Sequence, residues 1–173
     1  FMEIKAFIGL GNPGPQFFGT RHNIGFAIID HLSDRYDACW IKKDIMEIAE
    51  ISINDKKILL IKPSTYMNSS GKVLPFLTKK GIRADNIVVI HDELELPFGV
   101  IKCKIGGSAK GHNGLKSIIA GIGDGFHRLR FGISRPGNRD DVPEYVLKKF
   151  SENNQILEQK IDQAVDELVN YFL

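Results

Sequence analysis

Hydrophobic positions along this chain of 173 residues fall into two alternating patterns. Short apolar runs bounded by glycine, proline or acidic residues predict buried strands, and apolar residues recurring every three or four positions predict helices. The predicted strands cover residues 4–10, 86–92, 100–105 and 128–134. Residues 46–53 and 57–61 flank the turn sequence NDK, which predicts a hairpin.

Four segments have helical spacing. The first begins at Asn23, the second runs from Thr65 to Lys80 with a bend at the interior Pro75, and the third covers residues 114–122. The fourth is a C-terminal helix capped by Ser151, and its apolar stripe is Leu157, Ile161, Val165, Leu168 and Phe172. Strands that alternate with helices predict an α/β fold. We expect a single domain with a mixed, mostly parallel twisted sheet and helices on both faces.

Composition is that of an ordinary globular protein, and the length favours one domain over residues 1–173. Phe1 precedes Met2 and is expected to be foreign to the natural chain. No apolar run approaches the roughly 20 residues that span a bilayer, so we expect no membrane association. Cys39 and Cys103 lie far apart, which argues against a disulfide framework or a zinc site and favours a reducing cytoplasm.

Charge is unevenly distributed although the net charge is only +2. The window from Pro97 to Arg139 contains eight Lys or Arg and one acid, Asp124, and so carries +7. Residues 140–173 contain eight acids and three lysines, which gives −5. This asymmetry indicates an anionic partner on one face. The alternative is a basic surface that is simply solvated.

The stretch GLGNPG at residues 9–14 matches the G-x-G-x-x-G pattern of dinucleotide-binding turns. Such a turn needs a helix that begins within the motif and presents its N-terminus to the pyrophosphate. Here Pro13, Pro15 and Gly19 prevent that helix, and the helical spacing starts about ten residues later. The acid that would hold the ribose is also missing. The motif therefore does not indicate a nucleotide-dependent oxidoreductase.

Five polar residues instead lie at predicted strand-to-helix junctions: Asn12, His22, Asn68, Asp92 and Asn113. Ligands of open α/β sheets bind at the carboxyl ends of the strands. A histidine at a helix N-terminus is expected to stay neutral because of the helix dipole, which suits a general base. Taken singly, the asparagines could be turn formers or helix caps and His22 a surface residue. Their shared placement favours a site.

Four blocks carry a resemblance to a known family: GLGNPGPQFFGTRHNIGF, KPSTYMNSSGK, HDELELPFG and GGSAKGHNGLKSI. Their order and spacing resemble the signature blocks of bacterial-type peptidyl-tRNA hydrolases, from about residue 4 to Pro136. The resemblance implies hydrolysis of the ester between a peptide and tRNA, which recycles tRNA from aborted translation. It makes His22 the catalytic base and Asp92 its supporting acid. Asn12 would sense an N-blocked aminoacyl group, and Asn68 and Asn113 would hold the peptide and the tRNA end.

Two positions depart from the family pattern. Phe17 stands where members usually have tyrosine, so stacking on the tRNA terminus remains but a hydroxyl contact is lost. Tyr66 stands at a neighbouring tRNA-contact position that is often phenylalanine. Many members also continue beyond the point that corresponds to Leu173. Any contact that such a C-terminal extension makes with the peptide or tRNA in those members is not expected from residues 1–173.

Residue types support the same chemistry. There is no G-x-S-x-G motif, and Cys39 and Cys103 lack a nucleophile motif, which leaves His22 as a base acting on water. An amide from Asn12, Asn68 or Asn113 would polarise the carbonyl, and the sequence does not distinguish among them. The histidines lack metal-ligand spacing, so we expect neither a metal nor another cofactor.

The basic window is expected to contact the tRNA acceptor stem and CCA end through the backbone phosphates, without base specificity. Its candidate residues are Lys102, Lys104, Lys110, Lys116, Arg130 and Arg135. Alternatively, Arg128 and Arg130 pair with acids of the C-terminal helix. We expect a monomer that does not bind DNA. The main rival to the enzyme is a non-catalytic RNA-binding relative, which the intact polar set disfavours.

Overall fold

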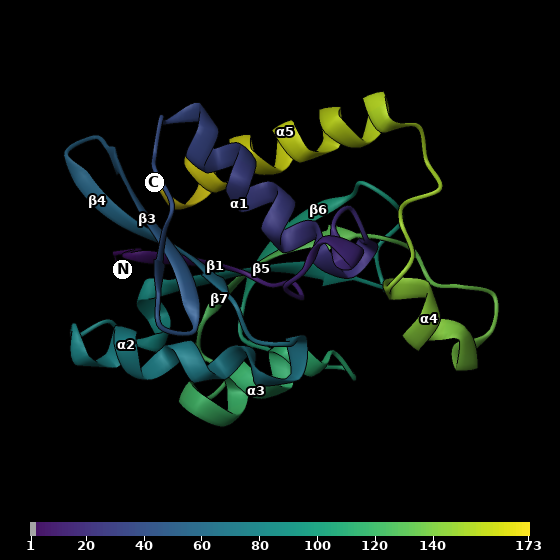
Figure 1. Ribbon diagram of the computed structural model, residues 1–173, viewed down its shortest axis with the longest axis horizontal. Helices are drawn as coiled ribbons and strands as arrows, with labels where there is room; N and C mark the ends of the chain where they lie inside the picture. The colour runs from purple at the N-terminus through teal and green to yellow at the C-terminus, as the bar shows by residue number, and fades with distance from the viewer. Residues whose placement is uncertain (1–2) are drawn as a thin grey trace.

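The computed structural model describes residues 3–173, which form one seven-stranded sheet with the order β2-β3-β4-β1-β5-β7-β6 (Figure 1). Phe1 therefore lies outside the described residues. The strands are β1 (Ala6–Gly9), β2 (Ile41–Lys43), β3 (Met46–Ile53), β4 (Lys56–Pro63), β5 (Ile87–Glu93), β6 (Ile101–Ile105) and β7 (His127–Gly132).

Strands β4, β1, β5 and β7 run parallel to one another in the middle of the sheet. Strand β3 is antiparallel to β4, β2 is antiparallel to β3, and β6 is antiparallel to β7. Strand β2 therefore runs in the same direction as β4, so five of the seven strands (β2, β4, β1, β5 and β7) are parallel in direction. The predicted hairpin and the mixed, mostly parallel sheet are confirmed.

Helices cover both faces of the sheet, as predicted. In Figure 1, α1 and α5 lie on one face, and α2 and α3 lie on the other. The α-helices are α1 (Ile24–Arg35), α2 (Leu74–Lys79), α3 (Asn113–Ile122), α4 (Val142–Val146) and α5 (Asn154–Phe172). Short 3₁₀ turns are η1 (Pro15–Phe17), η2 (Arg21–Asn23), η3 (Met67–Val73), η4 (Ala84–Asn86) and η5 (Arg139–Asp141). Each face has its own apolar core, and all four residues of β1 are buried between the two.

Two predicted helix features are wrong. The segment from Thr65 to Lys80 is not one bent helix, since η3 breaks at the non-helical Ser69 and a new helix, α2, begins at Leu74. Pro75 lies in the first turn of α2, where its missing N–H costs no hydrogen bond. Asn153 rather than Ser151 caps α5, because its side-chain oxygen accepts a hydrogen bond from the Gln155 N–H.

Two short elements escaped the sequence analysis. Strand β2 has three exposed residues and therefore no apolar pattern, and the five residues of α4 are too few to show a helical period. Within residues 3–173, no helix is long and apolar enough to cross a membrane.

Gly9 of the GLGNPG stretch and Gly25 at the start of α1 have a packing role. A Cβ on Gly9 would lie 2.5 Å from the Gly25 carbonyl oxygen, and a Cβ on Gly25 would lie 2.4 Å from the Ile90 carbonyl oxygen. The start of α1 can therefore touch the backbones of β1 and β5 only because both positions lack a side chain. This close approach places the turn η2, which carries His22, directly over the strand ends.

Candidate active site

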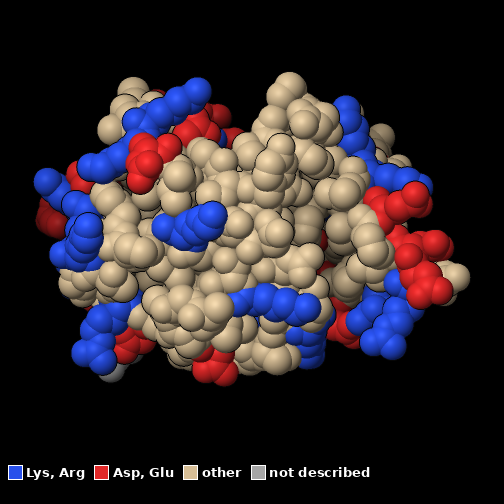
Figure 2. Space-filling model, turned by 60° about the horizontal axis from the view of Figure 1, so that its bottom comes forward, with Lys and Arg blue, Asp and Glu red and all other residues tan. Residues whose placement is uncertain are grey.

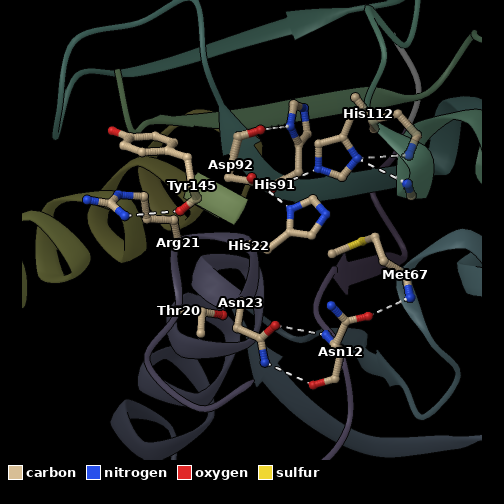
Figure 3. A network of polar contacts seen from close by, with 12 residues as sticks. Asn12, Thr20, Arg21, His22, Asn23, Met67, His91, Asp92, His112 and Tyr145 are labelled. Carbon is tan, nitrogen blue, oxygen red and sulfur yellow. Dashed lines mark hydrogen bonds and ion pairs between the residues drawn. The ribbon is translucent and has the colours of Figure 1, made fainter. Parts of the chain in front are cut away.

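Strands β1 and β5 are parallel neighbours, with Gly9 opposite Ile90, so their carboxyl ends open at the same edge of the sheet. The chain leaving β1 carries Asn12, and the end of β5 carries Asp92. Turn η2 brings His22 between them (Figure 3). The structure thus gathers three of the predicted site residues in one place.

Asp92 is 4% exposed and accepts hydrogen bonds from two histidines. Its Oδ2 lies 2.8 Å from His22 Nδ1, and its Oδ1 lies 2.7 Å from His112 Nε2. His112 Nδ1 accepts from the Gly114 and Leu115 N–H groups, so the proton of a neutral His112 must be on Nε2. Likewise the Asp92 carboxylate fixes the proton of a neutral His22 on Nδ1. Within residues 3–173 no group bonds to Nε2 of His22, so this nitrogen keeps a free lone pair, as a general base requires.

Burial is the largest single effect on the pKa of His22 and would lower it, but the attraction and hydrogen bond of Asp92 outweigh burial and raise the pKa above 6.5. Burial likewise opposes ionisation of Asp92, yet His22 and His112 hold the pKa of Asp92 well below its ordinary value. The site therefore keeps a buried carboxylate that stabilises a proton on His22.

The raised pKa corrects the expectation that a helix dipole keeps His22 neutral. His22 does lie next to the start of α1, but the full charge of Asp92 at 2.8 Å has the larger effect. The side chain of His22 is 12% exposed, so water can reach the ring.

Asn12 is held by a second network on the other side of His22 (Figure 3). Its Oδ1 accepts from the Met67 N–H at 2.7 Å, which fixes the orientation of the amide. The buried Asn23 locks the backbone of Asn12 by accepting from its N–H and donating to its carbonyl. Nδ2 of Asn12 forms no hydrogen bond within residues 3–173 and remains a donor for a ligand. Asn23 was assigned no role in the site from the sequence, although it lies in the block GLGNPGPQFFGTRHNIGF.

His112 was also missed, because its only notable feature in the sequence was its position beside Asn113. The structure brings His22, Asp92 and His112 together, with one ligand atom of each within 4.8 Å of the others. The spacing argument against a metal site was therefore insufficient, since these residues come from three distant segments. The set contains the ligand types that Zn²⁺ binds, but the hydrogen bonds described above already account for its geometry.

His91 lines the same region and is kept neutral. Burial, and then the neighbouring His112, lower its pKa to about 3. Its Nδ1–H donates to the Asp92 carbonyl at 2.8 Å, which ties the ring to the backbone of β5.

A cleft of about 370 Å³ adjoins His22 and Asp92. Apolar side chains of Leu94, Val142 and Val146 form part of its wall. Five cationic residues also line it: Lys104, Lys110, Arg128, Arg135 and Arg139. Because only Asp92, Glu93 and Glu95 oppose them, the cleft has a positive excess that suits an anionic ligand.

The remaining predicted binding residues divide between two sides of the site. Asn113 is the first residue of α3 and lines the cleft, while His112 rather than Asn113 caps the helix. Tyr66 and Asn68 are exposed around the start of η3, outside the cleft lining. Phe17 packs edge-to-face on Tyr66, with ring centres 6.3 Å apart.

Figure 2 turns the α2 and α3 side of the molecule toward the viewer. Charged side chains lie mainly around the margin of this face, and its centre carries few of them. Since η3 packs on α3, Asn68 lies on this side of the sheet and outside the cationic cleft.

The predicted basic residues of β6 and β7 share one sheet face. Lys102 is directly opposite Arg130, and Lys104 is opposite Arg128. Cys103 packs instead on the core beneath α1 and α5, and burial, followed by Glu167, raises its pKa to about 11. Alternation along β6 thus points the cysteine inward and the two lysines to the other face, and a thiol with a raised pKa is a poor nucleophile. Lys116 lies on α3 outside the cleft lining.

The alternative pairing of Arg128 and Arg130 with acids of the C-terminal helix is wrong. Both side chains lie on the sheet face opposite α5, because residues alternate along β7. Arg128 is 1% exposed and donates to the carbonyls of Gly107 and Ser108, and Arg130 pairs with Glu93 at 3.7 Å.

Fold and site together define an α/β protein whose site has the geometry that activation of water would need: a histidine hydrogen-bonded to a buried carboxylate, and an oriented amide donor. The chain belongs to the peptidyl-tRNA hydrolase family, whose model matches residues 6–173. It is 47% identical over 167 residues to a peptidyl-tRNA hydrolase of Rickettsia bellii, covering 94% of this chain and 90% of the relative.

Two further proteins show the same relationship. The Rickettsia prowazekii peptidyl-tRNA hydrolase is 48% identical over 169 residues, which cover 95% of this chain and 89% of the relative. The crystal structure of peptidyl-tRNA hydrolase from Acinetobacter baumannii superposes with a TM-score of 0.86 at 39% identity, covering 96% of this chain and 85% of that chain. The predicted family and fold are therefore confirmed.

Proposed function

We propose that this chain hydrolyses the ester between a peptide, or an N-blocked aminoacyl group, and the ribose of tRNA, and so recycles tRNA from aborted translation. One observation carries the mechanism: His22 has its proton fixed on Nδ1 by Asp92 and its Nε2 free. An assay for release of N-acetyl-aminoacyl groups from tRNA tests the activity directly.

In the first step Nε2 of His22 takes a proton from water, and the resulting hydroxide attacks the ester carbonyl carbon. The positive charge that develops on the His22 ring is stabilised by Asp92, 2.8 Å away. His112 supports the carboxylate from the other oxygen and keeps it turned toward His22. A positioned base contributes roughly 10²–10⁴-fold to the rate.

Nδ2 of Asn12 is the donor best placed for the carbonyl oxygen as it gains negative charge. Its partner oxygen is already occupied by the Met67 N–H, so the amide cannot turn away. Collapse of the tetrahedral intermediate breaks the bond to the ribose oxygen, which takes the proton from Nε2 of His22. The products are a peptide carboxylic acid, which then loses its proton to the solvent, and a tRNA with a free terminal hydroxyl.

Charge indicates which side of the site takes which half of the substrate. The cationic cleft, lined by Asn113, suits the terminal nucleotide of the CCA end. Asn68 lies outside this cleft, on the side that the family resemblance assigns to the peptide, and the Phe17–Tyr66 pair is available for stacking on the tRNA terminus. The acceptor stem then continues along the basic residues of β6 and β7.

A non-catalytic RNA-binding relative is the alternative function. It would have no need for a buried carboxylate that fixes a histidine tautomer, so the hydrogen bonds of Asp92 favour the enzyme. We further propose that the protein acts as a monomer in the cytoplasm, where translation takes place, without a cofactor and without binding DNA.

Asn12→Asp is expected to lower kcat by about 10²–10³-fold and to narrow the preference for N-blocked substrates. Aspartate keeps the acceptor for the Met67 N–H but places a negative oxygen where Nδ2 was. That oxygen repels the developing oxyanion and attracts a free α-ammonium group. Comparing kcat/KM for N-acetyl-aminoacyl-tRNA and free aminoacyl-tRNA measures the effect. Asn54→Asp, at the exposed turn between β3 and β4, is the control, and an unchanged preference in Asn12→Asp contradicts the assignment.

The double change Lys102→Ala and Lys104→Ala is expected to weaken binding equally for unrelated tRNAs. The slope of log Kd against the logarithm of the salt concentration should decrease in magnitude by roughly 2, about one unit for each lost lysine–phosphate contact. The matched control is Lys56→Ala with Lys57→Ala, at the start of β4, on the sheet edge opposite the strand ends that carry the site. If the double variant shows the same salt dependence as the wild type, Lys102 and Lys104 do not contact tRNA, and the contacts are assigned instead to Lys110, Lys116 and Arg135.

A further inference from the structure

Arg21, the residue before the proposed base, is buried in an unusual way. It is 6% exposed, and no Asp or Glu within residues 3–173 forms an ion pair with it. Its Nε is buried without a hydrogen-bond partner. A buried charge without a counter-ion is costly and is retained only where other contacts offset the cost.

Those contacts all come from one segment, the end of α4 and the residues that follow it. The Arg21 guanidinium lies 3.9 Å from the centre of the Tyr145 ring, a cation–π arrangement, and its Nη1 donates to the Tyr145 carbonyl at 3.0 Å. Figure 3 shows the two side chains beside the Asp92–His22 pair. Phe150 adds a second ring, 5.9 Å away.

Backbone contacts join the same two segments. The Arg21 N–H donates to the Lys148 carbonyl at 3.0 Å, and Thr20 forms an antiparallel bridge with Lys149. The Tyr145 hydroxyl in turn donates to the Ile133 carbonyl, just beyond the end of β7. Residues 145–149 are therefore held between the turn that carries His22 and the sheet.

The segment held in this way is also a wall of the cleft. Val142, Pro143 and Val146 of α4 line the cleft that His22 and Asp92 adjoin. A ligand in the cleft thus touches α4, and α4 is fixed to the residue next to the base. The hydrolysis step does not use Arg21 itself, since its guanidinium is occupied by Tyr145.

We propose that Arg21 is a positioning residue that sets the distance between the α4 wall of the cleft and the His22 ring. The proposal rests on the proposed function, in which the cleft holds the terminal nucleotide of tRNA. A nucleotide pressed against α4 then has its ester at a fixed distance from Nε2 of His22. Arg21 acts through placement, whereas the affinity for tRNA comes from the basic surface.

This division predicts a separation of kcat from KM. Arg21→Met keeps the length of the side chain but removes the donor and the cation, so α4 can shift relative to His22. A misplacement of about 1 Å can cost on the order of 10²-fold in rate, and we expect kcat to fall by about 10–10²-fold while KM for peptidyl-tRNA stays nearly unchanged. Arg21→Lys, which keeps one donor but no planar stacking surface, should have an intermediate kcat.

Arg35→Met is the matched control, because Arg35 on α1 forms an exposed pair with Asp166 that is remote from the cleft. All variants are assayed well below their melting temperatures, with the folded fraction measured by circular dichroism. A purely structural role would lower the melting temperature of Arg21→Met and leave kcat per folded molecule equal to that of Arg35→Met. That result would overturn the proposal.

Tyr145→Leu provides an independent variant should Arg21→Met fail to fold, because it removes the ring under the guanidinium and leaves the backbone acceptor in place. We expect a smaller loss of kcat in this variant, and a wild-type kcat there would also overturn the proposal. The wild-type assay separates the two hypotheses. An inactive wild type refutes the proposed function, whereas an active wild type with an equally active Arg21→Met refutes only the positioning role.

Discussion

His22→Ala is expected to lower kcat by roughly 10²–10⁴-fold, the contribution of a positioned general base. The change removes Nε2, the ring nitrogen that is free to accept a proton from water, and leaves the Asp92 carboxylate with His112 as its remaining histidine donor. Affinity for tRNA should be retained, because the basic residues of β6 and β7 are untouched. Hydrolysis of N-acetyl-aminoacyl-tRNA and binding of uncharged tRNA measure the two effects.

The matched control is His31→Ala, since His31 lies on α1 with its ring nitrogens near Glu158 and Asp162, away from the cleft. This variant should hydrolyse substrate at the wild-type rate. If His22→Ala keeps more than about a tenth of the rate, which is far above the loss expected for a positioned base, His22 is not the base.

Asp92→Asn is expected to lower kcat by up to about 10⁴-fold with little change in melting temperature. His112 can present only its Nε2–H at this position, because its Nδ1 accepts from two backbone N–H groups. The oxygen of the new amide must therefore face His112, and its NH₂ group faces His22. His22 then accepts on Nδ1 and carries its proton on Nε2, which is the wrong tautomer for a base. Every hydrogen bond is still made, so folding is preserved.

The pH dependence of the residual activity provides a second measurement. In the wild type Asp92 raises the pKa of His22, and the neutral base is lost as the pH falls through that raised value. Without the carboxylate charge, burial alone acts on the ring and lowers its pKa. The acid limb of the kcat/KM profile, which reports the pKa of the free enzyme, should therefore move to lower pH in Asp92→Asn. A wild-type rate together with an unshifted acid limb would mean that Asp92 does not act on His22.

Much of the fold could be predicted because its signals are local. Apolar runs and the turn at residues 54–56 identified the central strands and the hairpin, and a stripe of period 3.6 identified α1 and α5. Where local signals were weak or conflicting, the predictions were wrong or missing. Pro75 was interpreted as a bend although it opens α2, and α4 was too short to show a period. The wall of the cleft was therefore not foreseen.

The candidate residues could be named from the sequence, since Asn12, His22 and Asp92 all lie at the ends of predicted elements and in motif blocks. Their geometry could not. His22 and Asp92 are 70 residues apart, and Asn12 and Met67 are 55 apart, so only the pairing of β1 with β5 and the packing of η3 bring them into contact. The sequence also left open which asparagine polarises the carbonyl, a choice that depends on the orientation of an amide.

By itself, the sequence determined the alternation of strands and helices, the residue types at the strand ends and the basic window, because period, turn chemistry and charge are properties of neighbouring residues. The tertiary structure decided the tautomers, the pKa values and the place of each cation. His112 and Arg128 show why. His112 fixes the Asp92 carboxylate, and Arg128 holds the loop at Ser108, each through a contact with a residue about 20 positions away in the sequence. Such contacts depend on burial and distance in the folded chain, which local pattern does not encode.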